Sequence, residues 1–304
     1  MKYLKGFNKS SVVLEDFLKK QKLKNNSQET IDYYKKRIGY FIDFTKNKQV
    51  WKFNKNDYNN YVLFLNKKDI AEATIKTSLT AVRVFLNFLY KEKYIKNDIV
   101  SELDNFKCGK KTIVVLSQEQ IREIYSYYKE NTFYGARNLF LISLMLDCGL
   151  RVSEVLELKK DDVNINLSCI KVHGKGNKER IVPLSQVTLY YYYNYIKFPQ
   201  VNTYFGVNIA GGRLTSSAIR RFLLELRDNL GYVELYPHYL RHSFATWFLI
   251  NGGDPLALQQ ILGHTTLYMT ENYVHIASQI LIALNVRYSP LSNIPYFLKK
   301  RIPK

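Results

Sequence analysis

The stretch that most constrains this chain runs from residue 237 to residue 276 and contains four of its five histidines. It begins PHYLRHSFATWFLINGG, in which His238, Arg241 and His242 stand three and four residues apart. On a helix this spacing places them on one face, one turn apart. The neighbouring positions are largely apolar, and the pair Gly252 and Gly253 predicts the end of the helix. The stretch therefore predicts a helix with an apolar body and a basic face.

A second, shorter helix is expected to begin at Asp254 and Pro255, which suit the N-cap and the first helical position. It ends in the sequence LGH, whose last residue is His264, and Tyr273 follows nine residues later. Arginine and imidazole donors on one face suit an oxyanion such as a phosphate. A nearby tyrosine is a candidate nucleophile. The alternative interpretation is a core helix with an exposed arginine and incidental histidines.

A zinc site would need more than the pair of histidines in this helix. His238 and His242 have the spacing of a metal-binding pair, but Tyr239 stands where the HExxH motif has its glutamate. Arg241 would also repel a cation. We therefore predict no metal site.

Composition indicates a globular chain with a polyanionic partner. A length of 304 residues predicts two domains, and the net charge of +19 favours nucleic acid. The basic excess is divided between both parts of the chain, so both are candidates to face DNA, although charge alone does not separate DNA from RNA or an acidic membrane surface. The cysteines form no disulfide or metal pattern, and no apolar run is long enough for a membrane span. We expect a cytoplasmic protein without membrane attachment.

The sequence pattern of residues 1–105 predicts a helical domain that could bind DNA. Apolar periodicity and caps indicate helices over residues 11–20, 27–45, 55–66 and 71–91. The last of these has a complete apolar stripe and carries Thr74, Lys76 and Arg83 on its other positions. Hydroxyl and basic side chains supply most contacts to DNA phosphates, which makes these three candidate DNA-binding residues. The alternative is an ordinary solvated helix face.

Residues 106–115 predict a linker, residues 116–286 a second domain, and residues 287–304 a basic tail. Ser117 with Gln120 has the pattern of a capping box. Of the four consecutive tyrosines at residues 190–193, we expect two to have their rings in the core and two to have them outside it. We expect helices over residues 117–130, 137–148, 185–197, 214–230 and 279–286, a short helix ending at Leu158, paired strands over residues 169–172 and 180–184, and a short strand over residues 204–208.

Basic residues recur at the ends and turns of these elements. Arg151 begins a helix directly after the break at Gly149, and its alternative role is a structural ion pair with Glu154. The turn between the paired strands reads HGKGNKE and lacks the GxxxxGK[ST] pattern of a phosphate-binding loop. Further candidate DNA-binding residues in this half are Lys178, Arg180, Arg213 and Arg220.

Taken in order, the motifs GLRVSE, HGKGNKER, HYLRH and LGH, followed by a tyrosine, resemble the tyrosine recombinase (phage integrase) family, and within it the Xer-like site-specific recombinases. The resemblance is specific from about residue 115 to residue 276 and looser over residues 10–105. It implies a mainly α fold with a small antiparallel β-sheet. It also implies a C-shaped clamp, made of a helical core-binding domain and a catalytic domain.

The resemblance also implies the chemistry. DNA is cut and rejoined through a 3′-phosphotyrosyl intermediate and a Holliday junction, by four protomers on double-stranded DNA, without a cofactor. The implied catalytic residues are Arg151, Lys175, His238, Arg241, His264 and Tyr273, the last of which is the nucleophile. The biological role is either chromosome dimer resolution or the integration and excision of a mobile element. Two alternatives are a relaxing enzyme of the type IB topoisomerase kind and a catalytically idle DNA-binding module.

Overall fold

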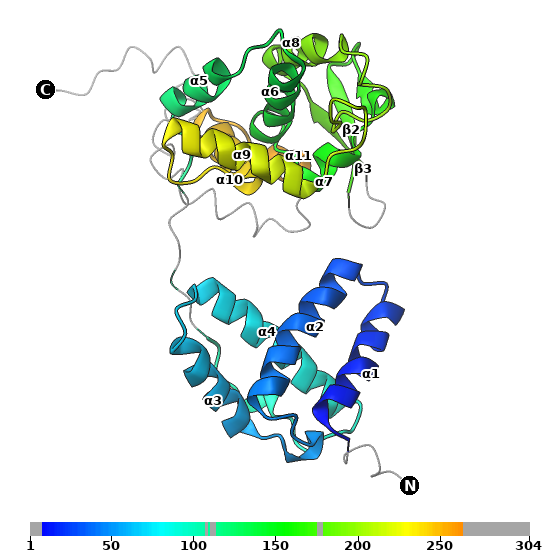
Figure 1. The fold of residues 1–304 in the computed structure, drawn as a ribbon, viewed down its shortest axis with the longest axis vertical. Coiled ribbons are helices and arrows are strands. Elements are labelled where there is room, and N and C mark those ends of the chain that lie inside the picture. Colours follow the sequence, from blue (N-terminus) through cyan, green and yellow to red (C-terminus); the bar gives the residue numbers. More distant parts are fainter. Residues whose placement is uncertain (1–7, 107–108, 110–113, 175–178, 264–304) are drawn as a thin grey trace, which may run out of the picture. The chain divides into compact units, whose positions relative to one another are not determined.

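The computed structural model describes residues 8–106, 109, 114–174 and 179–263. The chain divides into two compact units, residues 1–112 and 113–304, and each is described by itself (Figure 1). Among the described residues, none of the helices is both long enough and apolar enough to cross a membrane.

The first unit is helical throughout its described residues. Its order is α1 (Ser10–Leu23), α2 (Gln28–Phe44), η2 (Val50–Lys52), α3 (Lys55–Asn66), α4 (Glu72–Lys91) and η3 (Val100–Glu102). Helix α2 begins where the Ser27 hydroxyl accepts a hydrogen bond from the amide of Thr30, so the predicted cap is confirmed. Helix α3 begins with a capping box between Asn54 and Asp57.

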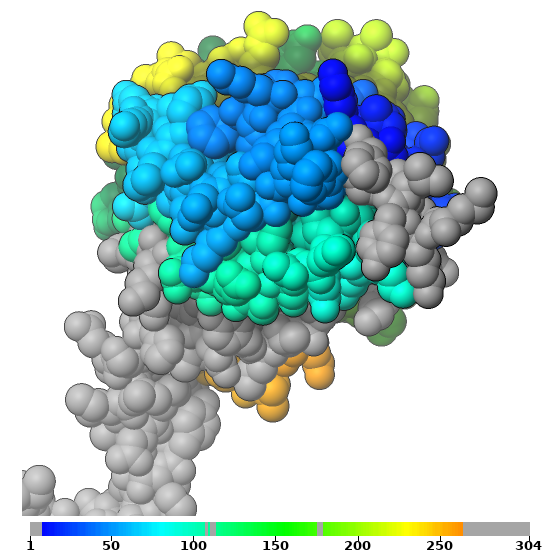
Figure 2. Space-filling view, turned by 90° about the horizontal axis from the view of Figure 1, so that it is seen from below, coloured from blue at the N-terminus to red at the C-terminus, as the bar shows by residue number. Residues whose placement is uncertain are grey.

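The core of the first unit lies between the apolar faces of its helices. Helix α2 packs against both α1 and α4, and Figure 1 shows these helices side by side. The fully buried ring of Phe17 makes an edge contact with that of Phe85, at a centroid distance of 5.6 Å. Figure 2 shows one face of this unit, where residues coloured blue to cyan form a continuous surface.

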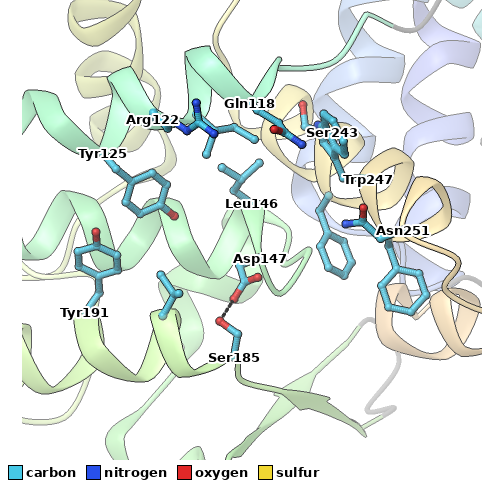
Figure 3. Close-up of a pocket in the computed structure, with 14 residues that line it drawn as sticks. Gln118, Arg122, Tyr125, Leu146, Asp147, Ser185, Tyr191, Ser243, Trp247 and Asn251 are labelled. Carbon is cyan, nitrogen blue, oxygen red and sulfur yellow. Dashed lines mark hydrogen bonds between the residues drawn. The ribbon is translucent and has the colours of Figure 1, made fainter.

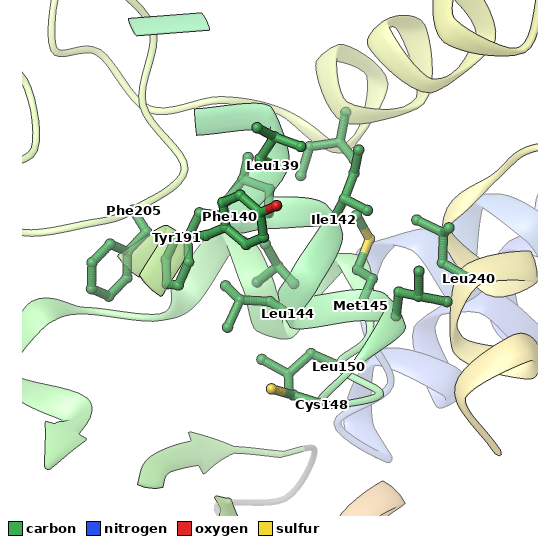
Figure 4. Close-up of a cluster of buried hydrophobic side chains, with 14 of the residues drawn as sticks. Leu139, Phe140, Ile142, Leu144, Met145, Cys148, Leu150, Tyr191, Phe205 and Leu240 are labelled. Atoms are coloured by element: carbon green, nitrogen blue, oxygen red, sulfur yellow. The ribbon is translucent and has the colours of Figure 1, made fainter. Parts of the chain in front are cut away.

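The second unit surrounds one central helix. Its helices are α5 (Gln118–Tyr127), α6 (Phe133–Leu146), α7 (Val152–Glu157), η4 (Lys160–Asp162), α8 (Gln186–Ile196), α9 (Ser216–Leu230), α10 (Pro237–Ile250) and α11 (Pro255–Leu262). Helix α6 is apolar on nearly every side and packs against α8 and α10. Its side chains Phe140, Ile142 and Met145 lie in the core cluster of Figure 4, with Leu240 reaching them from α10.

A small antiparallel sheet lies in the second unit. It has the order β1 (Val163–Asn164), β2 (Cys169–His173) and β3 (Glu179–Pro183). In the β2–β3 hairpin Ile170 lies opposite Val182, and both are buried on the inner face. The sequence did not predict β1, which is two residues long. The predicted strand over residues 204–208 is wrong, because this segment makes only isolated bridges at Tyr204 and Val207.

The mainly α fold with a small antiparallel sheet is confirmed for the described residues. The capping box of Ser117 and Gln120 is present. The helix that it begins ends at Tyr127, three residues before the predicted end. Two of the four consecutive tyrosines, at positions 191 and 192, are buried and the other two are exposed, as expected. The predicted helix over residues 279–286 lies outside the described residues, and the C-shaped clamp stays a prediction.

Candidate active site

A buried carboxylate organises the basic residues of the second unit. Glu154 of α7 has only 5% of its side chain exposed and lies among three arginine side chains. Its Oε1 accepts hydrogen bonds from Arg151 at 3.0 Å and from Arg180 at 2.8 Å. Its Oε2 accepts from the second terminal nitrogen of Arg180 at 2.9 Å and lies 3.8 Å from Arg241. One negative charge therefore fixes guanidinium groups from three separate elements.

The C-terminal end of α11 holds the same arginines from the other side. The carbonyl oxygen of Leu262 accepts from Arg151 at 3.3 Å and from Arg241 at 2.8 Å. The carbonyl oxygen of Ile261 accepts from Arg180 at 2.6 Å. The last carbonyls of a helix have no partner within the helix and carry partial negative charge, which suits guanidinium donors. The three arginines thus join the start of α7, β3 and α10 to the end of α11.

Glu154 remains ionised in these surroundings. Burial alone raises the pKa of its carboxyl, but the hydrogen bonds and charge of Arg180, followed by those of Arg151, outweigh burial and leave the pKa below its ordinary value. Its Oε2 also accepts from the backbone amide of Arg151 at 2.7 Å, which caps α7. Glu154 therefore fixes both the start of the helix and the side chain of Arg151.

The turn before Arg151 requires glycine. Gly149 has a φ of +66°, a left-handed conformation that L side chains rarely adopt. A Cβ atom there would lie 2.5 Å from the ring of Phe244 and 2.8 Å from Leu262. The Gly149 carbonyl also accepts a short hydrogen bond from Arg241. This turn consequently fixes the entry to α7 and one side of the Arg241 guanidinium.

The histidines of α10 lie on the basic face that the sequence predicted. The ring centroids of His238 and His242 are 6.4 Å apart. Partial burial, followed by the charges of Arg241, Arg151 and Arg220, lowers the pKa of His238 below its ordinary value. Burial and the neighbouring His238 lower the pKa of His242. A neutral imidazole at position 238 can accept a proton at neutral pH.

Arg151 is the arginine of this cluster with the most accessible side chain. It keeps 33% of its side-chain surface exposed, against 12% for Arg180 and 5% for Arg241. A guanidinium has several donors, so Arg151 can hold Glu154 and Leu262 and still meet an anion from solvent. The site therefore offers a fixed, partly exposed cation beside a neutral imidazole, which suits a phosphate with an attacking hydroxyl.

The structure describes three of the six predicted catalytic residues. It describes Arg151, His238 and Arg241, whose mutual influence appears in the lowered pKa of His238. Lys175, His264 and Tyr273 lie outside the described residues, as does Lys178. Among the described residues, no group of three or more potential metal ligands is arranged to hold an ion.

The predicted DNA-binding residues occupy different surroundings. Arg180 is largely buried and committed to Glu154 and Ile261, so its place favours a positioning role. Arg213 is exposed, donates to Glu157 at 2.6 Å and stacks on the ring of Tyr204.

Arg220 on α9 is exposed. In the first unit Lys76 is exposed, Thr74 is half-buried, and Arg83 donates to the carbonyl of Asp104 at 2.9 Å. The DNA contacts of these residues stay predictions.

A separate apolar cavity lies between α5, α6, α8 and α10 (Figure 3). Its volume is about 640 Å³, and the arginines around Glu154 do not line it. Asp147 and Ser185, joined by a hydrogen bond, lie at one side of it. Its apolar lining includes Ile121, Tyr125, Leu146, Tyr191, Phe244 and Trp247.

Sequence reasoning missed the central role of Glu154. Glu154 stands in GLRVSE, where its spacing to Arg151 indicates a single ion pair, but nothing nearby in the sequence indicates a second partner. The second partner, Arg180, is 26 residues away in sequence. Strand β3 packs against α11 and pairs with β2, which contacts α7, and this tertiary packing brings Arg180 to the carboxylate.

Comparison with known proteins agrees with this architecture. A family model described as the phage integrase family matches residues 114–279, and one described as the phage integrase N-terminal SAM-like domain matches residues 14–93. The chain belongs to the phage integrase family.

Its relatives share most of its length. Tyrosine recombinase XerD of Oceanobacillus iheyensis is 30% identical over 292 residues, which cover 91% of this chain and 98% of that protein. Tyrosine recombinase XerC of Bacillus pumilus is 29% identical over 281 residues, covering 88% and 92%.

Solved structures share the fold. The XerH site-specific recombinase bound to a palindromic difH substrate has a TM-score of 0.72 at 23% identity, covering 91% of this chain and 84% of that one. A lambda integrase dimer bound to a COC′ core site has a TM-score of 0.73 at 15% identity, covering 87% and 95%.

Proposed function

We propose that this chain is a site-specific DNA recombinase that cuts and rejoins DNA through a covalent link between Tyr273 and the 3′ phosphate. The observation that carries the proposal is the arginine cluster around Glu154, which presents Arg151 beside His238 on a chain of the phage integrase family. The sequence relatives are tyrosine recombinases. The XerH and lambda integrase structures, which share the fold, contain bound DNA.

The chemistry assigns one task to each group. The Tyr273 hydroxyl oxygen attacks the scissile phosphorus, and the bond to the 5′ oxygen breaks as the tyrosyl bond forms. An unperturbed tyrosine has a pKa near 10, so it needs a proton acceptor, and neutral His238 is that base. Lys175 protonates the departing 5′ oxygen. The non-bridging oxygens are held by Arg151, Arg241 and His264.

The reverse reaction rejoins the strands. A 5′ hydroxyl from another duplex attacks the phosphotyrosyl link, and Tyr273 leaves with the proton that His238 returns. The energy of the original phosphodiester bond is kept in the protein–DNA link. The reaction therefore needs neither a nucleotide cofactor nor a metal ion.

Both units contribute to holding the duplex. The net charge of +19 compensates DNA phosphates, and exposed Lys76 and Arg220 are candidates to contact them. The two units close on the DNA as a clamp, and four protomers exchange strands pairwise through a Holliday junction. The protein acts in the cytoplasm, where the chromosome and mobile elements offer its target sites.

A covalent-capture experiment tests this function. The full chain is incubated with nicked duplexes whose central region is randomised, and adducts that survive denaturant are recovered and sequenced. We expect the wild-type protein to enrich one palindrome-like site and Tyr273→Phe to give no adduct. An undiminished adduct from Tyr273→Phe, or none from the wild type on any sequence, would refute the proposal. Relaxation of a plasmid without recombinant product would favour a topoisomerase.

A further inference from the structure

The solvent face of the β2–β3 hairpin carries charged side chains that the proposed chemistry does not use. Lys171 and His173 of β2 and Glu179 of β3 are exposed on it. His173, the last residue of β2, pairs in register with Glu179, the first residue of β3. Between these two strand ends the sequence carries Lys175.

The ring of His173 bridges two carboxylates from different elements. Its Nε2 lies 3.2 Å from Oδ1 of Asp162, the last residue of η4. Its Nδ1 lies 3.1 Å from Oε1 of Glu179. The two ring nitrogens of His173 thus each face a carboxylate oxygen, one from η4 and one from β3. The other oxygen of Glu179 is 2.8 Å from the ammonium of Lys171.

Asp162 is a fixed anchor for this bridge. Its side chain is only 11% exposed, and its Oδ2 accepts from the backbone amide of Lys159 at 2.8 Å. Strand β1 begins at the next residue and pairs with β2. The contact to Asp162 therefore ties His173 to a turn outside the hairpin.

The inner face of the hairpin, at the same strand ends, contacts the arginine cluster around Glu154. Arg180 follows Glu179 directly, and side chains alternate between the two faces of a strand. The Arg180 guanidinium reaches Glu154 at 2.8 Å, while Glu179 faces His173. The hairpin base is thus held on its inner side through the arginine cluster and on its outer side through His173.

We propose that His173 is a positioning residue, which bridges Asp162 and Glu179 and thereby fixes the two strand ends between which Lys175 lies in the sequence. This role rests on the proposed function, in which Lys175 protonates the leaving 5′ oxygen. His173 itself touches no reacting atom. Misplacement of a catalytic group by about 1 Å can cost about 100-fold in rate, so a contact of this kind is enough to matter.

A sulfur-substituted substrate separates this role from a general structural one. In a duplex whose scissile 5′ oxygen is replaced by sulfur, the leaving group departs as a thiolate, which needs no proton because thiols are far more acidic than alcohols. The ordinary duplex and the sulfur-substituted duplex both carry the site sequence recovered by covalent capture. We expect His173→Ala to cleave the ordinary nicked substrate about 10- to 100-fold more slowly than wild type and the sulfur substrate at nearly the wild-type rate.

Matched variants sharpen the test. Ile181→Ala changes a side chain of β3 that is 61% exposed and that takes no part in the bridge, and it should match wild type on both substrates. His173→Arg places a guanidinium with several donors between the carboxylates and should recover most of the rate. Glu179→Gln weakens one contact and should show the same selective loss to a smaller degree.

Two results would overturn the positioning role. One is equal slowing of His173→Ala on both substrates, and the other is no slowing on either. Absence of any adduct from the wild-type protein on both substrates would instead refute the proposed function, and this role with it.

Discussion

At the scale of single residues, Glu154 has the largest influence on the site. It is a buried acid whose two oxygens are both occupied by guanidinium donors. A buried ion pair contributes little net stability compared with an apolar replacement, but removal of one partner leaves uncompensated charge. The three arginines around Glu154 would become such charges if the carboxylate were lost. Their positions, and therefore the proposed phosphate contacts, depend on this one side chain.

Replacement of Glu154 by glutamine tests this dependence. Glu154→Gln keeps the shape but removes the charge, and we expect the free energy of unfolding to fall by about 3–5 kcal/mol. Urea denaturation measures the change. Glu157→Gln, on the same helix with 61% of its side chain exposed, is the control and should change stability by less than about 1 kcal/mol. A Glu154→Gln protein as stable as wild type would show that the arginines are held without it.

The lowered pKa of Glu154 predicts how the stability of the protein depends on pH. The pKa of Glu154 is lower in the folded protein than in the unfolded chain, where it is about 4.3. Its contribution is therefore fully present above that value and is lost as pH falls through the folded pKa. We expect stability measured between pH 7 and pH 3 to fall more steeply for wild type than for Glu154→Gln. Parallel curves would contradict the lowered pKa.

Gly149 is the second residue on which the site depends. A left-handed backbone costs an L residue about 1 kcal/mol, and overpacking against Phe244 adds about 1–3 kcal/mol. Gly149→Ala should therefore lower the unfolding free energy by about 2–4 kcal/mol. Gly231→Ala is the matched control, because Gly231 also has a positive φ but its Cβ would meet no atom within 4 Å. Equal losses in the two variants would mean that the close approach of Phe244 is unimportant.

At the scale of elements, α10 carries the proposed proton acceptor. The pKa of His238 lies below its ordinary value of about 6.5, because of partial burial and then the charges of Arg241, Arg151 and Arg220. The base is therefore neutral above that value and loses activity as pH falls through its pKa. We expect single-turnover cleavage to show an acid limb with its midpoint below about pH 6.5. In His238→Gln the rate should be lower and this limb absent. A midpoint above 6.5 would contradict the assignment.

Elements with a regular apolar period were predictable from sequence. The stripe of α4 and the caps at Ser27 and Ser117 depend only on residues within one turn of each other. The two-residue strand β1 and the segment at residues 204–208 were not predictable, because pairing with a distant strand decides them. Arg180 shows the same limit within the site. The alternation of side chains along β3 can be read from the sequence. The carboxylate that Arg180 contacts, however, belongs to Glu154 on α7.

At the scale of the whole molecule, the apolar cavity suggests how protomers assemble. The apolar residues Ile280, Leu281, Leu284 and Val286, which lie outside the described residues, could fill it from the same protomer or from a neighbouring one, and the second case predicts contacts between protomers at this cavity. Val187→Glu, at a cavity-lining position that is 58% exposed, should place a charge there without unfolding the protein. Sedimentation of protein–DNA complexes should then show fewer tetramers, while single-site cleavage changes little. Val233→Glu, at a position that is 92% exposed and outside the cavity, should assemble normally. Unchanged tetramers with Val187→Glu would mean that the cavity takes no part in contacts between protomers.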